Sequence, residues 1–140
     1  FLGSEPPAEV LKVFEVVRDS RKAACERAHE AFSSGEEIRG CDLDRVTRGV
    51  ITEAGYGEYF VHRTGHSLHE CIHGNGAHLD DFETYDDRKL IPGTLFTVEP
   101  GIYMPQVGIG IRSEVDVYHT GQGAEVTGPP HQEELVRIEV

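Results

Sequence analysis

The sequence predicts an α+β fold in which two helices pack on one face of an antiparallel sheet. Apolar residues recur at helical spacing up to Gly55, whereas short alternating runs separated by Gly and Pro turns follow from Tyr56 onward. With 140 residues the chain has the length of one compact domain, so residues 1–140 are taken as a single unit.

The first helix is expected to follow Ser4-Glu5-Pro6-Pro7. Ser4 offers a capping side chain, and prolines suit the first helical turn because the missing N–H donors cost little there. The helix is expected to end at Ser33-Ser34-Gly35. Its apolar stripe comprises Val10, Phe14, Val17, Ala24, Ala28 and Phe32.

A shorter second helix is predicted from about Leu43 to Ala54. Asp42 is placed as its cap and Gly55 as its stop. Leu43, Val46, Val50 and Ala54 share one face of this helix.

The first clear strand is predicted over residues 95–99, where apolar and polar side chains alternate. Phe96 and Val98 then point to one face, and Thr97 and Glu99 point to the other.

A second alternating run covers residues 111–118 and places Arg112 and Glu114 on one shared face. The Pro- and Gly-containing connection from Pro100 to Gly110 suits antiparallel pairing of these runs. Residues 134–138 are predicted as a last strand.

Composition argues against several kinds of partner and compartment. Thirteen Lys and Arg against 25 Asp and Glu give a net charge of −12, which repels phosphate backbones and argues against nucleic acid as a partner. No apolar run approaches the roughly 20 residues of a membrane helix. Three cysteines without CxxC spacing (Cys25, Cys41 and Cys71) favour a reducing, cytoplasmic setting.

Histidines concentrate in one segment of twelve residues, His62 to His73, which holds four of the eight in the chain. Imidazole and carboxylate groups together suit divalent ions such as Mn, Co, Fe or Zn, and Gly65 would let the backbone approach closely beside His66. The alternative is a set of solvated loop histidines. Density alone does not separate these two interpretations.

Further along the chain, Glu99 precedes a forced turn at Pro100-Gly101, and Arg112 stands two residues before Glu114. Each has an ordinary alternative, an edge-strand glutamate and a surface ion pair respectively. The order of His, then Glu-Pro-Gly, then Arg-x-Glu is more specific than any one of these features.

Three blocks in this order resemble the signature blocks of the creatinase/aminopeptidase, or pita-bread, metallopeptidases. They are His62-Arg63-Thr64-Gly65-His66, Val98-Glu99-Pro100-Gly101-Ile102-Tyr103 and Gly110-Ile111-Arg112-Ser113-Glu114. The resemblance covers essentially the whole chain and implies the C-terminal half of a pita-bread catalytic domain.

The resemblance implies a metal site. His66 and Glu99 would be terminal ligands of one ion and Glu114 would bridge two, the ions being Mn, Co or Zn. Two ions about 3.5–4 Å apart would hold a bridging hydroxide as the nucleophile. Glu99 would transfer its proton to the leaving nitrogen.

It also implies substrate-binding residues. His62 and His73 match histidines that contact the substrate and stabilise the tetrahedral intermediate, and His73 would donate to the developing oxyanion. Arg112 matches the arginine of proline-directed members and favours cleavage of Xaa-Pro bonds.

The family's two aspartate ligands have no counterpart here. Phe1-Leu2-Gly3 resembles the end of the segment that follows the second aspartate, so the upstream half is expected to be absent. Four later aspartates are assigned instead to a solvated, turn-forming loop: Asp80, Asp81, Asp86 and Asp87. At most one ion is therefore expected in this chain, which by itself is predicted to be inactive.

Two functions remain open. One is an Xaa-Pro peptidase fragment acting on proline-containing peptides, and the other is a non-catalytic peptide- or protein-binding module. A half-domain should expose an apolar seam, so self-association or pairing with the missing half is expected.

Overall fold

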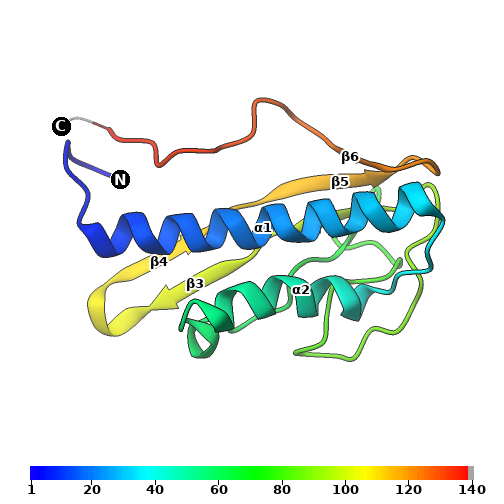
Figure 1. The fold of residues 1–140 in the computed structure, drawn as a ribbon, viewed down its shortest axis with the longest axis horizontal. Helices are drawn as coiled ribbons and strands as arrows, with labels where there is room; N and C mark the ends of the chain where they lie inside the picture. Colours follow the sequence, from blue (N-terminus) through cyan, green and yellow to red (C-terminus); the bar gives the residue numbers. More distant parts are fainter. Residues whose placement is uncertain (139–140) are drawn as a thin grey trace.

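The computed structural model describes residues 1–138 and has the predicted α+β architecture (Figure 1). Two helices, α1 (Ala8–Ser34) and α2 (Gly40–Glu53), lie side by side against the strands. The strands are β1 (Ser67–Leu68), β2 (Leu95–Val98), β3 (Gly101–Met104), β4 (Ile109–Arg112), β5 (Val115–His119) and β6 (Ala124–Val126). Short 3-10 turns occupy Gly57–Tyr59 and Pro105–Val107.

The strands form two antiparallel sheets rather than one. A four-stranded sheet has the order β1-β2-β5-β6, and β3 and β4 form a separate hairpin. Pro100 lies between β2 and β3 and has no N–H to continue the ladder, which explains why the pairing changes there.

Helix α1 has the predicted extent, but Ser4 does not cap it. Pro7 occupies the cap position with an extended backbone and makes no side-chain capping bond. At the other end Gly35 adopts the left-handed conformation (φ 73°), and its N–H reaches the carbonyl of Ala31.

Helix α2 begins two residues before the predicted cap. Asp42 lies in its first turn, where Oδ2 accepts a hydrogen bond of 3.0 Å from the backbone N–H of Arg39. A carboxylate can satisfy a free N–H from the third helical position as well as from the cap, so the sequence signal was assigned to the wrong position.

The buried apolar side chains form two clusters along α1. One joins the C-terminal part of α1 to the larger sheet and includes Ala28, Phe32, Phe96, Val98 and Val117. The other joins the N-terminal part of α1 to α2 and the hairpin. It contains Val13, Val17, Ile51, Tyr56, Phe60, Ile102 and Met104. Phe96 and Val98 therefore face the core together, as their alternation predicts.

The predicted strand over residues 111–118 is interrupted. Ser113 and Glu114 belong to no strand, and they separate β4 from β5. Ser113 N–H still donates to the carbonyl of Pro100 over 3.2 Å, so the two sheets remain joined at this point. The alternation of side chains along residues 111–118 does not reveal that β4 and β5 pair with different strands.

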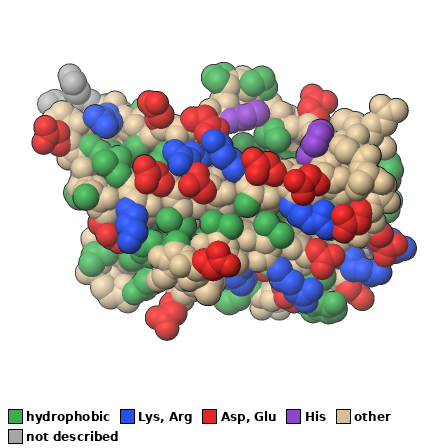
Figure 2. Space-filling model, viewed as in Figure 1, with side chains coloured by type: hydrophobic (Ala, Val, Ile, Leu, Met, Phe, Trp, Pro, Cys, Tyr) green, Lys and Arg blue, Asp and Glu red, His purple; other side chains and the backbone are tan. Residues whose placement is uncertain are grey.

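Residues 134–138 do not form the predicted strand. They contact the start of the chain through a parallel bridge between Leu2 and Ile138 and through hydrogen bonds that include Phe1 N to Val136 O at 2.9 Å. Within residues 1–138 no helix is long and apolar enough to cross a membrane. Acidic and basic side chains are interspersed over the face that carries α1, so this face offers no continuous basic surface (Figure 2).

One core histidine makes the packing of α1 on the sheet sensitive to pH. The ring of His119 stacks on Phe32 with centroids 3.6 Å apart, and its Nδ1 accepts a hydrogen bond from Gly121 N–H. Burial lowers the pKa of His119 below its ordinary value of 6.5. The folded protein therefore keeps this imidazole neutral where the unfolded chain already binds a proton.

We expect stability to fall as the pH drops below about 6.5, because the unfolded chain binds the proton on His119 at a higher pH than the folded chain does. Chemical denaturation between pH 5 and 8 measures this slope, and His119→Phe should reduce it. His69→Asn, at an exposed position, is the matched control and should leave the slope unchanged. An identical pH slope in the His119→Phe variant would contradict the expectation.

Candidate metal and substrate site

The histidine segment lies directly against β2 because Gly65 has no side chain. A Cβ at Gly65 would stand 1.9 Å from the carbonyl oxygen of Thr97, well inside contact distance. Backbone hydrogen bonds of 2.8 Å connect Thr97 N–H to His66 O and Glu99 N–H to Thr64 O. The close approach predicted at Gly65 is therefore present, and it sets His66 beside Glu99.

His66 and Glu99 form the centre of the candidate site. Nε2 of His66 lies 3.3 Å from Oε1 of Glu99, and both residues are almost fully buried. Nδ1 of His66 lies 3.1 Å from the carbonyl oxygen of Ser67, which can only accept. Nδ1 thus carries the hydrogen, and in the neutral ring the lone pair of Nε2 faces the carboxylate.

Thr97 holds this pair in register. Its Oγ1 accepts a 2.9 Å hydrogen bond from His66 N–H and donates over 3.1 Å to Oε1 of Glu99. Thr97 and Glu99 share a strand face, as predicted, and the hydroxyl connects the backbone of one site residue to the side chain of the other. Nothing in the sequence pattern singled out Thr97.

Arg112 and Glu114 approach Glu99 from the junction of the two sheets. Nη1 of Arg112 lies 3.3 Å from Oε2 of Glu99. Partial burial raises the pKa of Glu114, the negative charge of Glu99 raises it further, and Arg112 opposes both effects. Arg21 of α1 supports this junction by donating over 2.7 Å to the hydroxyl of Ser113.

The two predicted substrate-binding histidines have different neighbours in the site. The exposed His73 places its ring centroid 4.4 Å from that of His66. Nε2 of His62 instead lies 3.0 Å from the hydroxyl of Tyr103, which accepts a 2.9 Å hydrogen bond from Nε of Arg112. Burial lowers the pKa of His62, and the positive charge of Arg112 contributes to the same shift.

The relation between His62, Tyr103 and Arg112 was not predicted, although Tyr103 belongs to one of the quoted sequence blocks. Antiparallel pairing of β3 with β4 sets Gly101 opposite Arg112 and Tyr103 opposite Gly110. Gly101 leaves room for the Tyr103 ring, whose hydroxyl would lie 2.5 Å from a Cβ at this position. The glycine two residues before Tyr103 was the sequence signal that could have indicated this arrangement.

The later loop is shaped by aspartates as predicted, but Asp80 and Asp86 are buried rather than solvated. Asp80 is buried, and its carboxylate accepts hydrogen bonds from the N–H groups of Phe82, Glu83 and Thr84. Asp86 pairs with Arg88, and Asp81 pairs with Arg45. Hydrogen bonds and ion pairs within the protein therefore account for the carboxylates of Asp80, Asp81 and Asp86.

The donor set at the centre fits a cation in part. A bare imidazole nitrogen facing a carboxylate oxygen at 3.3 Å is an arrangement that a metal ion or a proton stabilises. The bond from Nδ1 to the Ser67 carbonyl matches the way outer partners orient histidine ligands. Among residues 1–138, however, no three His, Cys, Asp or Glu side chains converge closely enough to hold a metal ion.

Comparison with known proteins identifies the family of the chain. The family model of metallopeptidase family M24 matches residues 1–121. The chain belongs to metallopeptidase family M24. Over 112 residues it is 40% identical to the candidate dipeptidase YkvY of Bacillus subtilis, covering 80% of this chain and 28% of that protein.

Solved structures show the same relation in three dimensions. The dipeptidase PepE of Mycobacterium ulcerans matches with a TM-score of 0.82 at 29% identity, over 99% of this chain and 34% of that one. An Xaa-Pro dipeptidase of Bacillus anthracis matches with a TM-score of 0.80 at 36% identity, over 97% and 35% respectively. These neighbours confirm the pita-bread fold, and the chain spans about a third of the length of these relatives.

Gly65→Ala should destabilise the protein by about 1–3 kcal/mol or more, because the added methyl group overlaps the backbone of β2. Urea unfolding measures the change. Gly49→Ala is the matched control, since its Cβ meets nothing within 4 Å and alanine favours the helix by about 0.5–1 kcal/mol. Equal stability of the Gly65→Ala variant and the native chain would contradict the close contact.

Thr97→Val keeps the shape of the side chain but removes its hydroxyl. We expect a loss of about 1–3 kcal/mol, because the buried His66 N–H loses its acceptor. Urea unfolding should show this loss, and the His66 amide should exchange with solvent faster. Thr97→Ser, which keeps the hydroxyl, should retain the slow exchange. Equal stability and equal His66 amide exchange in the Thr97→Val and Thr97→Ser variants would show that the hydroxyl does not hold His66 and Glu99 together.

Proposed function

We propose that this chain supplies the metal- and substrate-binding part of a divalent-metal peptidase that hydrolyses Xaa-Pro bonds. The observation that carries the proposal is the buried pair of His66 and Glu99, with Arg112 on the second carboxylate oxygen. Membership of family M24 supports peptide hydrolysis, and the Xaa-Pro dipeptidase neighbour supports the bond that is cleaved.

The proposed ligands of the ion are His66, Glu99 and Glu114. Mn²⁺ and Co²⁺ are the ions chosen to test this proposal. A bound divalent ion activates water for attack on a carbonyl at neutral pH. Glu99 is proposed to accept the proton of that water and to deliver it to the leaving nitrogen. His73 is proposed to donate to the oxyanion that develops on the carbonyl.

The polar trio of His62, Tyr103 and Arg112 is proposed to orient the peptide. Its three groups are linked by hydrogen bonds of 3.0 and 2.9 Å, so the positive charge of Arg112 is held beside His62. A fixed guanidinium of this kind recognises a carboxylate, which a dipeptide ending in proline carries at its C-terminus.

The remaining length of the relatives is proposed to complete the site. Several large apolar side chains near the histidine segment are more than half exposed, among them Val61, Ile72 and Phe82. Apolar groups of this kind are suited to pairing with the rest of the domain or with a second copy. We propose that the protein acts in the cytoplasm, where its three free cysteines would stay reduced.

A peptide-binding module without catalysis is the second candidate. It is favoured by the finding that no three potential ligands converge within residues 1–138. The two candidates differ in whether His66 and Glu99 bind a divalent ion.

Calorimetric titration with Mn²⁺ and Co²⁺ separates the candidates. If the peptidase proposal holds, His66→Ala and Glu99→Ala should each weaken binding about tenfold or more, because each removes a ligand. His69→Ala, at an exposed position of the same segment, should bind like the native chain. Ion binding that is unchanged in the first two variants would favour the binding module.

Hydrolysis of Ala-Pro tests the peptidase directly. The chain joined to the upstream part of the Bacillus subtilis relative should cleave this dipeptide in the presence of Mn²⁺, and Glu99→Ala should abolish cleavage. A folded, metal-loaded chimaera without activity would overturn the proposal.

A further inference from the structure

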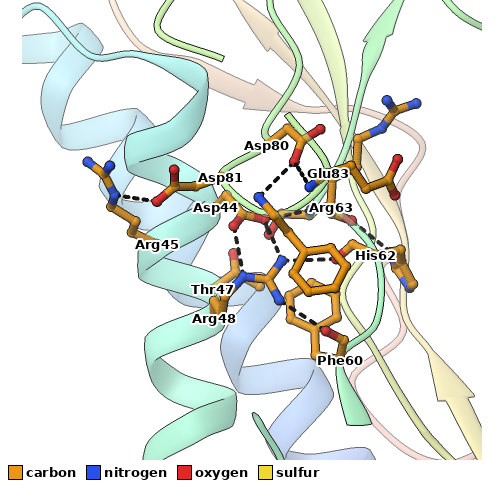
Figure 3. A network of polar contacts seen from close by, with 12 residues as sticks. Asp44, Arg45, Thr47, Arg48, Phe60, His62, Arg63, Asp80, Asp81 and Glu83 are labelled. Atoms are coloured by element: carbon orange, nitrogen blue, oxygen red, sulfur yellow. Dashed lines mark hydrogen bonds and ion pairs between the residues drawn. The ribbon is translucent and has the colours of Figure 1, made fainter. Parts of the chain in front are cut away.

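The backbone before His66 is held from the side of α2 by a single buried ion pair (Figure 3). Asp44 is fully buried, and its carboxylate accepts hydrogen bonds of 2.9 and 3.1 Å from Nε and Nη2 of Arg48. The two residues stand one turn apart on the same face of the helix. A planar guanidinium fork is the group best suited to such a bidentate contact.

Asp44 and Arg48 also form hydrogen bonds with the segment of residues 60–64. Nη1 of Arg48 donates to the carbonyl of Phe60 over 3.0 Å, and Nη2 donates to the carbonyl of His62 over 2.9 Å. Oδ1 of Asp44 accepts from both the N–H and the hydroxyl of Thr64, over 2.8 and 2.7 Å. Three alternate residues of the segment, Phe60, His62 and Thr64, are thus fixed to two side chains of one helix.

Two aromatic rings enclose the guanidinium group. Cζ of Arg48 lies 4.3 Å from the ring centroid of Phe60 and 4.6 Å from that of Phe82. These contacts limit the access of water and the rotation of the group, which strengthens its hydrogen bonds. Phe82 belongs to the loop shaped by Asp80, so Arg48 contacts both the histidine segment and that loop.

We propose that Asp44 and Arg48 are positioning residues that place the His62 imidazole beside Tyr103 and Arg112. The backbone carbonyl of His62 is bound by Arg48, and its side chain meets Tyr103 at 3.0 Å, so the residue is fixed at both ends. The consequence for catalysis rests on the proposed peptidase function, whereas the anchoring of residues 60–64 does not.

Imidazole nitrogen signals of the ¹⁵N-labelled chain, without metal or substrate, provide the test. In the native chain Nδ1 of His62 faces the carbonyl of Arg63 at 2.7 Å, so the spectrum should show one tautomer with the proton on Nδ1. Arg48→Met should shift the His62 signals toward an averaged imidazole. It should also speed exchange of the Thr64 amide by about tenfold or more, because local opening becomes easier.

Arg45→Met is the matched control. Arg45 lies on the same helix and pairs with Asp81 and Asp42, and its partners do not include residues 60–64. This variant should leave the His62 signals unchanged. An equal shift in the Arg45→Met variant would overturn the proposal, because the effect would then follow from any loss of charge on α2.

Arg48→Lys keeps the proposal testable if the methionine variant does not fold. Lysine preserves the charge opposite Asp44 but cannot reproduce the fork that reaches two carbonyls, so the His62 shift should persist in a folded protein. A native His62 spectrum in the Arg48→Lys variant would overturn the proposal. Because the readout needs no activity, failure of the peptidase assay would leave this result unaffected.

Discussion

The buried carboxylate of Asp44 is the constraint on which the candidate site depends. A charge without solvent is costly unless it is paired and hydrogen-bonded, and loss of one partner of such a pair commonly costs about 3–5 kcal/mol. Asp44 meets this requirement with four hydrogen bonds, two from Arg48 and two from Thr64. The stability of α2 and the placement of the histidine segment are therefore linked through this carboxylate.

The segment from Phe60 to His66 is held on two sides by different means. Side chains of α2 bind its first half, whereas the backbone of β2 binds its second half through the contact at Gly65. Helix α1 contributes indirectly. Arg21 donates a hydrogen bond to Ser113, which lies between Arg112 and Glu114 where the two sheets join. Each part of the fold thus restrains one edge of the site.

The sequence was most informative where a residue type has one structural use. The αL glycine at position 35 ended the first helix as expected, and Gly65 produced the expected close approach. Alternation in residues 95–99 identified both the core face and the shared side of Thr97 and Glu99. The helix end and the alternation depend on local backbone geometry, and Gly65 contributes by lacking a side chain.

Features that depend on tertiary partners were missed. The break at Ser113 reflects a change of sheet, and residues 134–138 lack a neighbouring strand apart from one bridge. Asp44 and Arg48 look like an ordinary helical ion pair in sequence, because the segment they bind lies 12 to 20 residues away. The functional roles of the site residues stay predictions that rest on the family resemblance. These residues are His62, His66, His73, Glu99, Arg112 and Glu114.

The exposed segment of residues 69–73 illustrates how such a site can diverge. Its base is closed by the 2.7 Å hydrogen bond from Gly74 N–H to Ser67 O, while the segment itself lies in solvent. Changes in its length or composition would move His73 without altering the distance between His66 and Glu99. This loop can therefore vary while the spacing of His66 and Glu99, fixed by main-chain contacts, stays constant.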